Sequence, residues 1–343
     1  MNKIHYIGAD VHSNNIEIAV RYGGEIAQRF SLPTTLAAIR PVLDSIRAPK
    51  ELAIEEGPMA GWLYRSLNTK VDRFIVAEPR RNKLISSDGD HDDPIDAAKL
   101  AMLLEGGFLK PVYHSQEQNR AILKKWVNLY HDTVKNAVRS INKIRACCRM
   151  EGVKIPATAI KNPEKRALWL GYLKAPGLAD QLNMLFVGYD AVAQQCRMAR
   201  QKLMTLSRDY PVVKQFEQVP GVGLIRSVTF FAYIDTPWRF KKKNKLWKYC
   251  GVGLERVTSG KDKKGRPKPA KLQLPWFCNR ILKNVILGAA ISAIRQKNNV
   301  FASDYERMVS DGIIQSNARH TVARKLLTTL WGIWKGSYQQ TLN

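Results

Sequence analysis

The stretch Ile4–Asp10, IHYIGAD, decides the fold, because it is a short apolar run that ends on a carboxylate. A second run follows at Ile16–Tyr22, and Gly23-Gly24 turns the chain into a third at Glu25–Leu32. Short runs rich in Ile, Val and Ala, bounded by polar or glycine turns, are typical of β-strands. We therefore predict a three-stranded meander with Asp10 at the end of its first strand.

The segments after the meander alternate between helical and strand patterns. In chain order they are a helix at 35–47, a strand at 52–56, a helix at 59–68, a strand at 73–76 and a helix that begins near Pro94. The predicted order βββαβαβα is that of the RNase H-like fold. In that architecture the first strand, the fourth strand and the last helix converge at one edge of the sheet.

Carboxylates occupy all three of these converging positions. Asp10 ends the first strand, Glu55 lies on the fourth, and Asp93 and Asp96 are three residues apart on one face of the last helix. Such a set can hold two divalent cations about 3.5–4 Å apart, which serve phosphodiester chemistry. Glu56 follows Glu55 directly, and because neighbouring strand residues point to opposite faces, only one of the two can face the site.

Simpler interpretations exist for each acid taken alone. Asp93 followed by Pro94 is a typical helix N-cap with proline at the first helical position. Asp10 alone could simply end a strand, and Asp88, Asp90 and Asp92 could form a solvated loop. The metal-site interpretation rests on three separate segments that carry acids where one fold requires them.

The charge of the chain is divided unevenly. The whole sequence has 55 Lys and Arg against 29 Asp and Glu, for a net charge of +26. The first 110 residues hold 14 basic and 15 acidic residues, which leaves 41 and 14 for residues 111–343. A near-neutral segment with clustered acids, joined to a strongly basic one, favours metal-dependent chemistry on nucleic acid. Non-enzymatic nucleic-acid binding is the simpler alternative.

Residues 111–210 are predicted to form a basic helical region. Val127, Tyr130, Val134, Val138 and Ile141 recur at helical spacing in a proline-free stretch. A second stripe alternates steps of three and four through Leu182, Leu185, Tyr189, Val192, Cys196, Ala199, Leu203 and Leu206. The second stripe indicates a coiled coil, formed either within the chain or between two protomers. Residues 151–177, with three prolines, are predicted to be a connector.

Residues 211–343 are predicted to form a mainly helical domain that contacts phosphates. The sequence Val219-Pro220-Gly221-Val222-Gly223, followed by an apolar helix, matches a helix-hairpin-helix element whose backbone N–H groups at Gly221 and Gly223 can hold a phosphate. A plain turn between helices is the alternative. A basic stretch follows at 241–271, with 12 Lys and Arg against two acids. Its candidate phosphate ligands are Lys241, Lys242, Lys243, Lys245, Lys261, Lys263, Lys264, Arg266 and Lys268.

Ser259 lies within this basic stretch, beside Gly260. A serine in a cationic, glycine-flanked segment can approach a phosphate, and composition alone would equally make it a turn residue.

The remaining composition bears on localisation. Five cysteines without a CxxC pair argue against a disulfide framework and a zinc knuckle, which favours a reducing compartment. No run approaches the roughly 18 apolar residues of a membrane span, and the first residues do not resemble a signal peptide. We expect a cytoplasmic protein.

The motifs together resemble the DEDD transposases of bacterial insertion sequences, the insertion sequence one-ten group, which includes Piv-type DNA invertases and recombinases guided by a bridge RNA. The resemblance covers most of the chain. It rests on YIGADV at 6–11, Ile54-Glu55 with Gly57 and Tyr64, DPIDA at 93–97, VPGVG at 219–223, YCGVGL at 249–254 and Thr258-Ser259-Gly260.

This resemblance implies a function. In the family, the acids matching Asp10, Glu55, Asp93 and Asp96 bind Mg²⁺, with two ions expected, in a RuvC-like domain, and the serine matching Ser259 is the nucleophile that forms a phosphoserine bond with DNA. It also implies donor and target DNA, a structured non-coding guide RNA and a homodimer that assembles into a tetramer as partners. The protein would associate with the bacterial nucleoid when active.

The expected organisation is a RuvC-like DEDD catalytic domain at 1–110, a basic helical and coiled-coil region at 111–210, and a C-terminal transposase domain at 211–343. The expected function is that of a transposase or site-specific DNA recombinase of an insertion sequence. Two alternatives stay open, a Piv-like invertase and a RuvC-type junction nuclease, the latter of which would need the acids without the serine.

Overall fold

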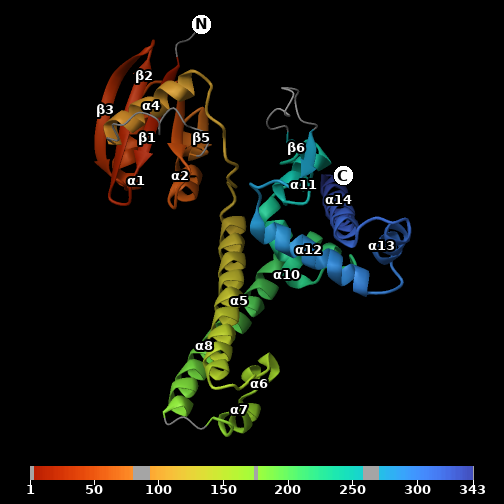
Figure 1. Cartoon of the computed structure of the whole chain (residues 1–343). Helices are drawn as coiled ribbons and strands as arrows, with labels where there is room; N and C mark the ends of the chain where they lie inside the picture. The colour runs from red at the N-terminus through yellow and green to blue at the C-terminus, as the bar shows by residue number, and fades with distance from the viewer. Residues whose placement is uncertain (1–3, 80–92, 174–176, 258–269, 343) are drawn as a thin grey trace, which may run out of the picture. The chain divides into compact units, whose positions relative to one another are not determined.

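The computed structural model describes residues 4–79, 93–173, 177–257 and 270–342, with side chains up to residue 336. The chain divides into two compact units, Met1–Asn119 and Arg120–Asn343, which we call the sheet unit and the helical unit. Figure 1 shows the mixed α/β architecture of the first and the mostly helical architecture of the second. This division of secondary structure is as the sequence predicts.

The sheet unit contains a five-stranded sheet in the order β3-β2-β1-β4-β5, in which β1, β2 and β3 are antiparallel and β1, β4 and β5 are parallel. The predicted order of strands and helices is confirmed. The elements are β1 (His5–Val11), β2 (Asn15–Tyr22), β3 (Glu25–Pro33), α1 (Leu36–Ser45), β4 (Lys50–Glu55), α2 (Ala60–Leu67), the 3₁₀ helix η1 (Asn68–Lys70), β5 (Arg73–Ala77) and α4 (Asp93–Glu105).

Helices cover both faces of this sheet (Figure 1). On one face Ile7 and Ile54 pack into a core that includes Leu43 of α1 and Leu63 of α2. On the other face Ala53, Ile75 and Ala77 pack against the leucines of α4. Because side chains alternate along a strand, the residues of β1 that face α4 are Tyr6, Gly8 and Asp10.

The contact of α4 with β1 is made at Gly8. Gly8 pairs with Ala19 on β2 and Ala53 on β4, so three small residues form a flat patch in the middle of the sheet. A Cβ atom at Gly8 would lie 2.2 Å from the Ala97 carbonyl oxygen and 2.4 Å from the Ala101 nitrogen. The helix backbone therefore rests almost directly on the strand backbone, which only glycine permits.

The helical unit is built from the following elements: α5 (Gln118–Met150), α6 (Ala157–Lys161), α7 (Pro163–Leu170), α8 (Leu178–Leu206), η3 (Ser207–Asp209), α9 (Pro211–Glu217), α10 (Leu224–Ile234), α11 (Lys243–Tyr249), β6 (Glu255–Val257), β7 (Lys271–Gln273), α12 (Arg280–Arg295), α13 (Val300–Ser310) and α14 (Gln315–Leu342). Among the described residues, no helix is both long enough and apolar enough to cross a membrane.

The two long helices α5 and α8 pair with each other within the chain (Figure 1), which answers one question that the sequence leaves open. Ile141 and Ile144 of α5 pack with Leu182 and Phe186 of α8. The prediction is wrong for Val138, whose side chain is 51% exposed. The buried stripe of α5 runs on through Ile144 and Cys148 in steps of three and four, and Val138 lies to one side of it.

Residues 151–177, predicted as a connector, contain the helices α6 and α7, which pack on the tip of the α5–α8 hairpin. Arg166 of α7 is buried there. Its guanidinium donates to both carboxylate oxygens of Asp190 on α8, at 2.6 and 2.7 Å, and to the Ile160 carbonyl oxygen. The hydrogen bonds from Arg166 lower the pKa of Asp190. Pro156 is the N-cap of α6 and Pro163 lies in the first turn of α7, positions where proline is compatible with a helix.

The remaining helices form one core around Trp334 of α14, which stacks on Phe231 of α10 and meets Phe216 of α9 edge to face. Leu123 and Val127 of α5 and Leu203 of α8 reach the same core. The buried face of α12 consists of Leu282, Val285, Ile286, Ala289, Ala290 and Ala293.

Replacing Gly8 by alanine tests the contact between β1 and α4. The added methyl group would overlap the backbone of α4, so G8A should destabilise the sheet unit by about 1–3 kcal/mol. The matched control is G57A, because a Cβ at Gly57 has no heavy atom within 4 Å. Chemical denaturation monitored by circular dichroism measures both. Equal stability of G8A and the wild type would contradict the close approach.

Candidate functional site

Two of the four predicted acids meet a histidine at the end of β1. The side chains of Asp10, His12 and Asp93 each offer a ligand atom, and these atoms lie within 4.8 Å of one another. His12 Nε2 is 3.0 Å from Asp10 Oδ2 and 3.4 Å from Asp93 Oδ1. The first turn of α4 thus brings Asp93 to Asp10, although 82 residues separate them in the sequence.

Backbone contacts fix each of these residues. The close approach at Gly8 places Ala97 over β1, so the preceding turn of α4, with Asp93 and Asp96, lies at the end of the strand that carries Asp10. Arg29 of β3 donates to the Pro94 carbonyl oxygen at 2.9 Å. The backbone of His12 is held by a hydrogen bond to Asn15 and by the hydroxyl group of Thr34.

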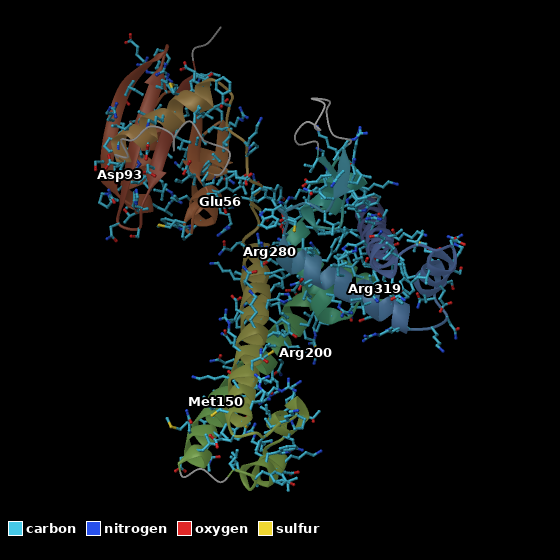
Figure 2. The ribbon with its side chains drawn as sticks, viewed as in Figure 1. Glu56, Asp93, Met150, Arg200, Arg280 and Arg319 are labelled. Atoms are coloured by element: carbon cyan, nitrogen blue, oxygen red, sulfur yellow. The ribbon has the colours of Figure 1, made fainter. Side chains whose placement is uncertain are left out.

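The register of β4 resolves the ambiguity between Glu55 and Glu56. Ala9 pairs with Ile54, so Asp10 and Glu55 come next on neighbouring parallel strands, and both alternate onto the face of α4. Glu56 instead bonds to His114 at 2.6 Å. Figure 2 shows Glu56 well apart from Asp93. Glu55 is therefore the acid on the side of the cluster, although its carboxylate is not within the 4.8 Å group.

Asp96 is the fourth predicted acid. It lies close enough to Asp10 to raise the pKa of that carboxyl group, and its Oδ1 is 3.9 Å from Lys99 Nζ on the same helix. It too is outside the 4.8 Å group. The structure therefore gathers Asp10 and Asp93 most closely, with Asp96 and Glu55 at the margin.

The electrostatics of the cluster are those of crowded acids. Burial raises the pKa of Asp10, and the neighbouring charges of Asp93 and Asp96 raise it further, while the hydrogen bond from His12 opposes both. The pKa of His12 is raised, chiefly by its hydrogen bond to Asp10. When His12 is protonated, its ring places a positive charge beside Asp10 and Asp93.

The cluster fits a hard divalent cation. Carboxylate oxygens are the preferred ligands of Mg²⁺ and Mn²⁺, and the pKa of Asp10 is raised by burial first and then by the charges of Asp93 and Asp96, so a bound cation would favour its ionised form. His12 is 49% exposed, so its ring can turn away or coordinate when a cation replaces its proton. Asp10 and Asp93 are the residues that would hold such an ion, and Asp96 and Glu55 are the further candidates on the same face of the sheet.

His12 is not among the site residues predicted from the sequence. The available signal was its position two residues after Asp10, on the same side of the extended chain, where a histidine can reach the same carboxylate.

In the predicted phosphate-binding hairpin, Gly221 packs against α12 and does not present its N–H to a ligand. Gly221 has a φ of +80°, and a Cβ there would lie 2.3 Å from the Ala289 carbonyl oxygen of α12. Its N–H, which we expected to be exposed, is donated to Gln296 Oε1 at 3.1 Å. Gly221 is therefore a packing glycine in this structure. Gly223 keeps its predicted place at the N-cap of α10.

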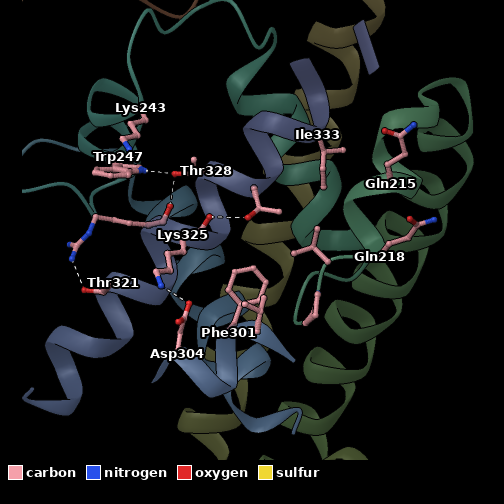
Figure 3. A pocket seen from close by; sticks show the side chains of 15 residues that line it. Gln215, Gln218, Lys243, Trp247, Phe301, Asp304, Thr321, Lys325, Thr328 and Ile333 are labelled. Carbon is pink, nitrogen blue, oxygen red and sulfur yellow. Dashed lines mark hydrogen bonds and ion pairs between the residues drawn. The ribbon is translucent and has the colours of Figure 1, made fainter. Parts of the chain in front are cut away.

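The predicted lysines that the structure describes are exposed near or on α11. Lys241 and Lys242 precede this helix, and Lys243 and Lys245 lie in its first turn. The ammonium group of Lys243 lies 5.6 Å from the ring centroid of Trp247, at the rim of a cavity of about 820 Å³ between α9, α11, α13 and α14 (Figure 3). The Trp247 indole is fixed by a hydrogen bond to Thr328.

The remaining predicted residues lie outside the described ones. They are Ser259, Lys261, Lys263, Lys264, Arg266 and Lys268, which fall in the sequence between β6 and β7. These two short strands pair with each other, Val257 opposite Lys271.

A comparison with known families bears on the helical unit. Residues 213–306 match the family model described as Transposase IS116/IS110/IS902 family. The match supports a transposase function and, with it, action on DNA. It includes α9 to α12 and the segment that contains Ser259. A search of curated proteins found no match to the chain.

The variant D10N tests whether Asp10 binds a metal ion, because it removes the charge of Asp10 without removing a group that folding requires. Because the pKa of Asp10 is raised in the folded state, its ionised form opposes folding at pH 7, and metal-free D10N should be at least as stable as the wild type. Mg²⁺ at about ten times its Kd should stabilise the wild type by about 1.4 kcal/mol, and D10N by much less.

Thermal unfolding with and without Mg²⁺ measures this difference. The control is D44N, which removes an exposed acid that pairs with Lys70. A shift with Mg²⁺ that is equal in D10N and the wild type would place the ion elsewhere.

Proposed function

We propose that this protein is a DNA transposase of an insertion sequence, which cuts and rejoins DNA through a phosphoserine bond at Ser259 and uses Mg²⁺ held by Asp10, Glu55, Asp93 and Asp96. The observation that carries the proposal is the transposase family match at residues 213–306. The acidic cluster at the end of β1 supplies the second component.

The fold of the sheet unit supports an RNase H-like, RuvC-like catalytic domain. Its order of elements is βββαβαβα, and the first strand, the fourth strand and the last helix bring their acids to one end of the sheet. The role of a bound Mg²⁺ would be to neutralise charge on phosphate oxygens beside these carboxylates. Without such a cation, four acids and a DNA phosphate would repel one another.

The chemistry at Ser259 is a balanced exchange of ester bonds. The serine Oγ attacks a DNA phosphorus atom, a P–O bond to deoxyribose breaks, and the released DNA hydroxyl group receives a proton. In the second step a DNA hydroxyl group attacks the phosphoserine, forms a new P–O bond and returns the proton to serine. The number of ester bonds is unchanged, so no external energy source is needed.

The basic helical unit has further proposed partners. The α9–α10 turn is proposed as a helix-hairpin-helix contact to DNA, with Gly223 at its phosphate-facing N-cap. The exposed lysines at α11 and the excess of positive charge support binding of a structured guide RNA through its backbone. A dimer, and a tetramer in the strand-exchange complex, is proposed so that the acids and Ser259 of different protomers meet.

Trapping the covalent intermediate tests the serine. The substrate is labelled DNA that contains the two ends of the genetic element in which this gene lies. The protein, together with any RNA that co-purifies with it, is incubated with this DNA and Mg²⁺, and the reaction is stopped by denaturing the protein. The wild type should carry label in a phosphoserine adduct, whereas S259A should form none and lose at least about 10³-fold in strand cleavage. T258A, which changes the neighbouring hydroxyl group, is the control. Normal cleavage by S259A would instead favour a RuvC-type nuclease.

The adjacent glutamates offer a matched pair of variants. E55Q should lower strand cleavage about 10²-fold or more, because Glu55 alternates onto the face of Asp10, whereas E56Q should retain most activity. Glu56 bonds to His114, so thermal unfolding of E56Q checks that this variant is folded. A strong loss in E56Q with normal activity in E55Q would reverse the assignment.

A further inference from the structure

Two adjacent aromatic side chains lie exposed beside the β6–β7 hairpin. Trp276 is 77% exposed and Phe277 is 72% exposed. Leu272 on β7 and Leu254 before β6 are also exposed. Large apolar side chains that lie together on a surface usually mark a binding site, because their exposure to water is unfavourable.

The backbone on both sides of this pair is fixed. Pro275 is buried on one side. On the other side Cys278 packs against Gly251, where a Cβ would lie 2.7 Å from the Cys278 Sγ. The Asn279 N–H is donated to the Tyr249 carbonyl oxygen at 2.9 Å, and the Asn279 side chain caps α12. The two rings are thus held outward by a short, anchored segment, which lowers the entropy cost of binding.

The elements on either side of this pair in the sequence carry exposed basic residues. Arg256 lies opposite Leu272 in the β6–β7 ladder, Lys271 begins β7 and Arg280 begins α12, and all three side chains are exposed. Figure 2 shows Arg280 at the start of its helix. Exposed rings among cations fit a ligand that is both aromatic and anionic. A second copy of this chain would bring the same positive charge, which disfavours self-association there.

We propose that Trp276 and Phe277 form a stacking platform for unpaired bases of DNA or RNA, with Arg256, Lys271 and Arg280 contacting the adjoining phosphates. The inference rests on the proposed action on DNA and deepens it, because strand exchange requires bases to leave their stack. Any base can stack on an aromatic ring, so the platform accepts unpaired bases of any sequence.

Equilibrium binding to nucleic acids of defined form tests the platform. The full-length protein is titrated, without Mg²⁺, with a mixed-sequence 30-nucleotide single strand of DNA, the same strand as RNA, and the DNA duplex. W276A should weaken binding to a single strand about tenfold, and W276F should restore most of it. Binding of the duplex should change less than twofold. The DNA and RNA arms show which strand the platform prefers.

Salt dependence separates stacking from charge. W276A should leave the slope of log K against log salt unchanged, whereas R280Q should reduce its magnitude by about one phosphate contact. F108A, which removes an exposed ring from the sheet unit, is the control and should bind like the wild type. Thermal unfolding confirms that each variant is folded.

Two outcomes would overturn the proposal: unchanged single-strand affinity in W276A, or equal losses for single strand and duplex. Sedimentation of the variant then distinguishes the causes of unchanged affinity, since W276A would change the sedimentation coefficient if the pair joined two copies of the protein. Because these measurements omit Mg²⁺ and strand cleavage, they do not depend on the catalytic proposal. A wild type that fails to cut DNA would contradict that proposal alone.

Discussion

The sheet unit depends on one backbone contact, the place where α4 rests on β1 at Gly8. Three small residues in register, Gly8, Ala19 and Ala53, make the surface flat enough for the helix to approach. The buried leucines of α4 then reach the core beside Ile75. At the far end of the helix, Glu105 pairs with Arg21 of β2, so the direction of α4 along β1 is fixed at both ends.

This contact also brings the acidic side chains of the candidate site close to one another. The same geometry that buries the leucines brings the first turn of α4 towards Asp10, and burial, with the added charges of Asp93 and Asp96, raises the pKa of that carboxyl group. The apolar burial and the acidic cluster are therefore two consequences of one helix position. A helix that lay farther from the sheet would relieve the repulsion and lose the core.

Much of the sheet unit could be predicted from the sequence because its signals are local. Asp10, Asp93 and Asp96 could be found since acids stood at the strand end and helix start that one fold brings together. The choice between Glu55 and Glu56 could not be made, because it depends on the register of β4 with β1. His12 was missed because its partnership with Asp93 exists only after α4 docks.

The helical unit was predicted less well, for related reasons. Spacing alone could not tell which side of α5 meets α8, so Val138 was placed on the wrong side of the stripe. Gly221 looked like a phosphate contact because its use as a packing residue depends on Ala289 of α12, which lies 68 residues later in the chain. Exposed Trp276 and Phe277 have no signal in hydrophobic periodicity, since only burial distinguishes them from core residues.

The Gly8 contact makes α4 and the acidic cluster mechanically dependent on each other. A Cβ at Gly8 would meet the backbone of both Ala97 and Ala101, which are four residues apart on α4. Both alanines are themselves buried, so the side chains beside the contact are small as well. A larger side chain at any of these three positions would lift the helix from the strand, and the turn that carries Asp93 would shift with it.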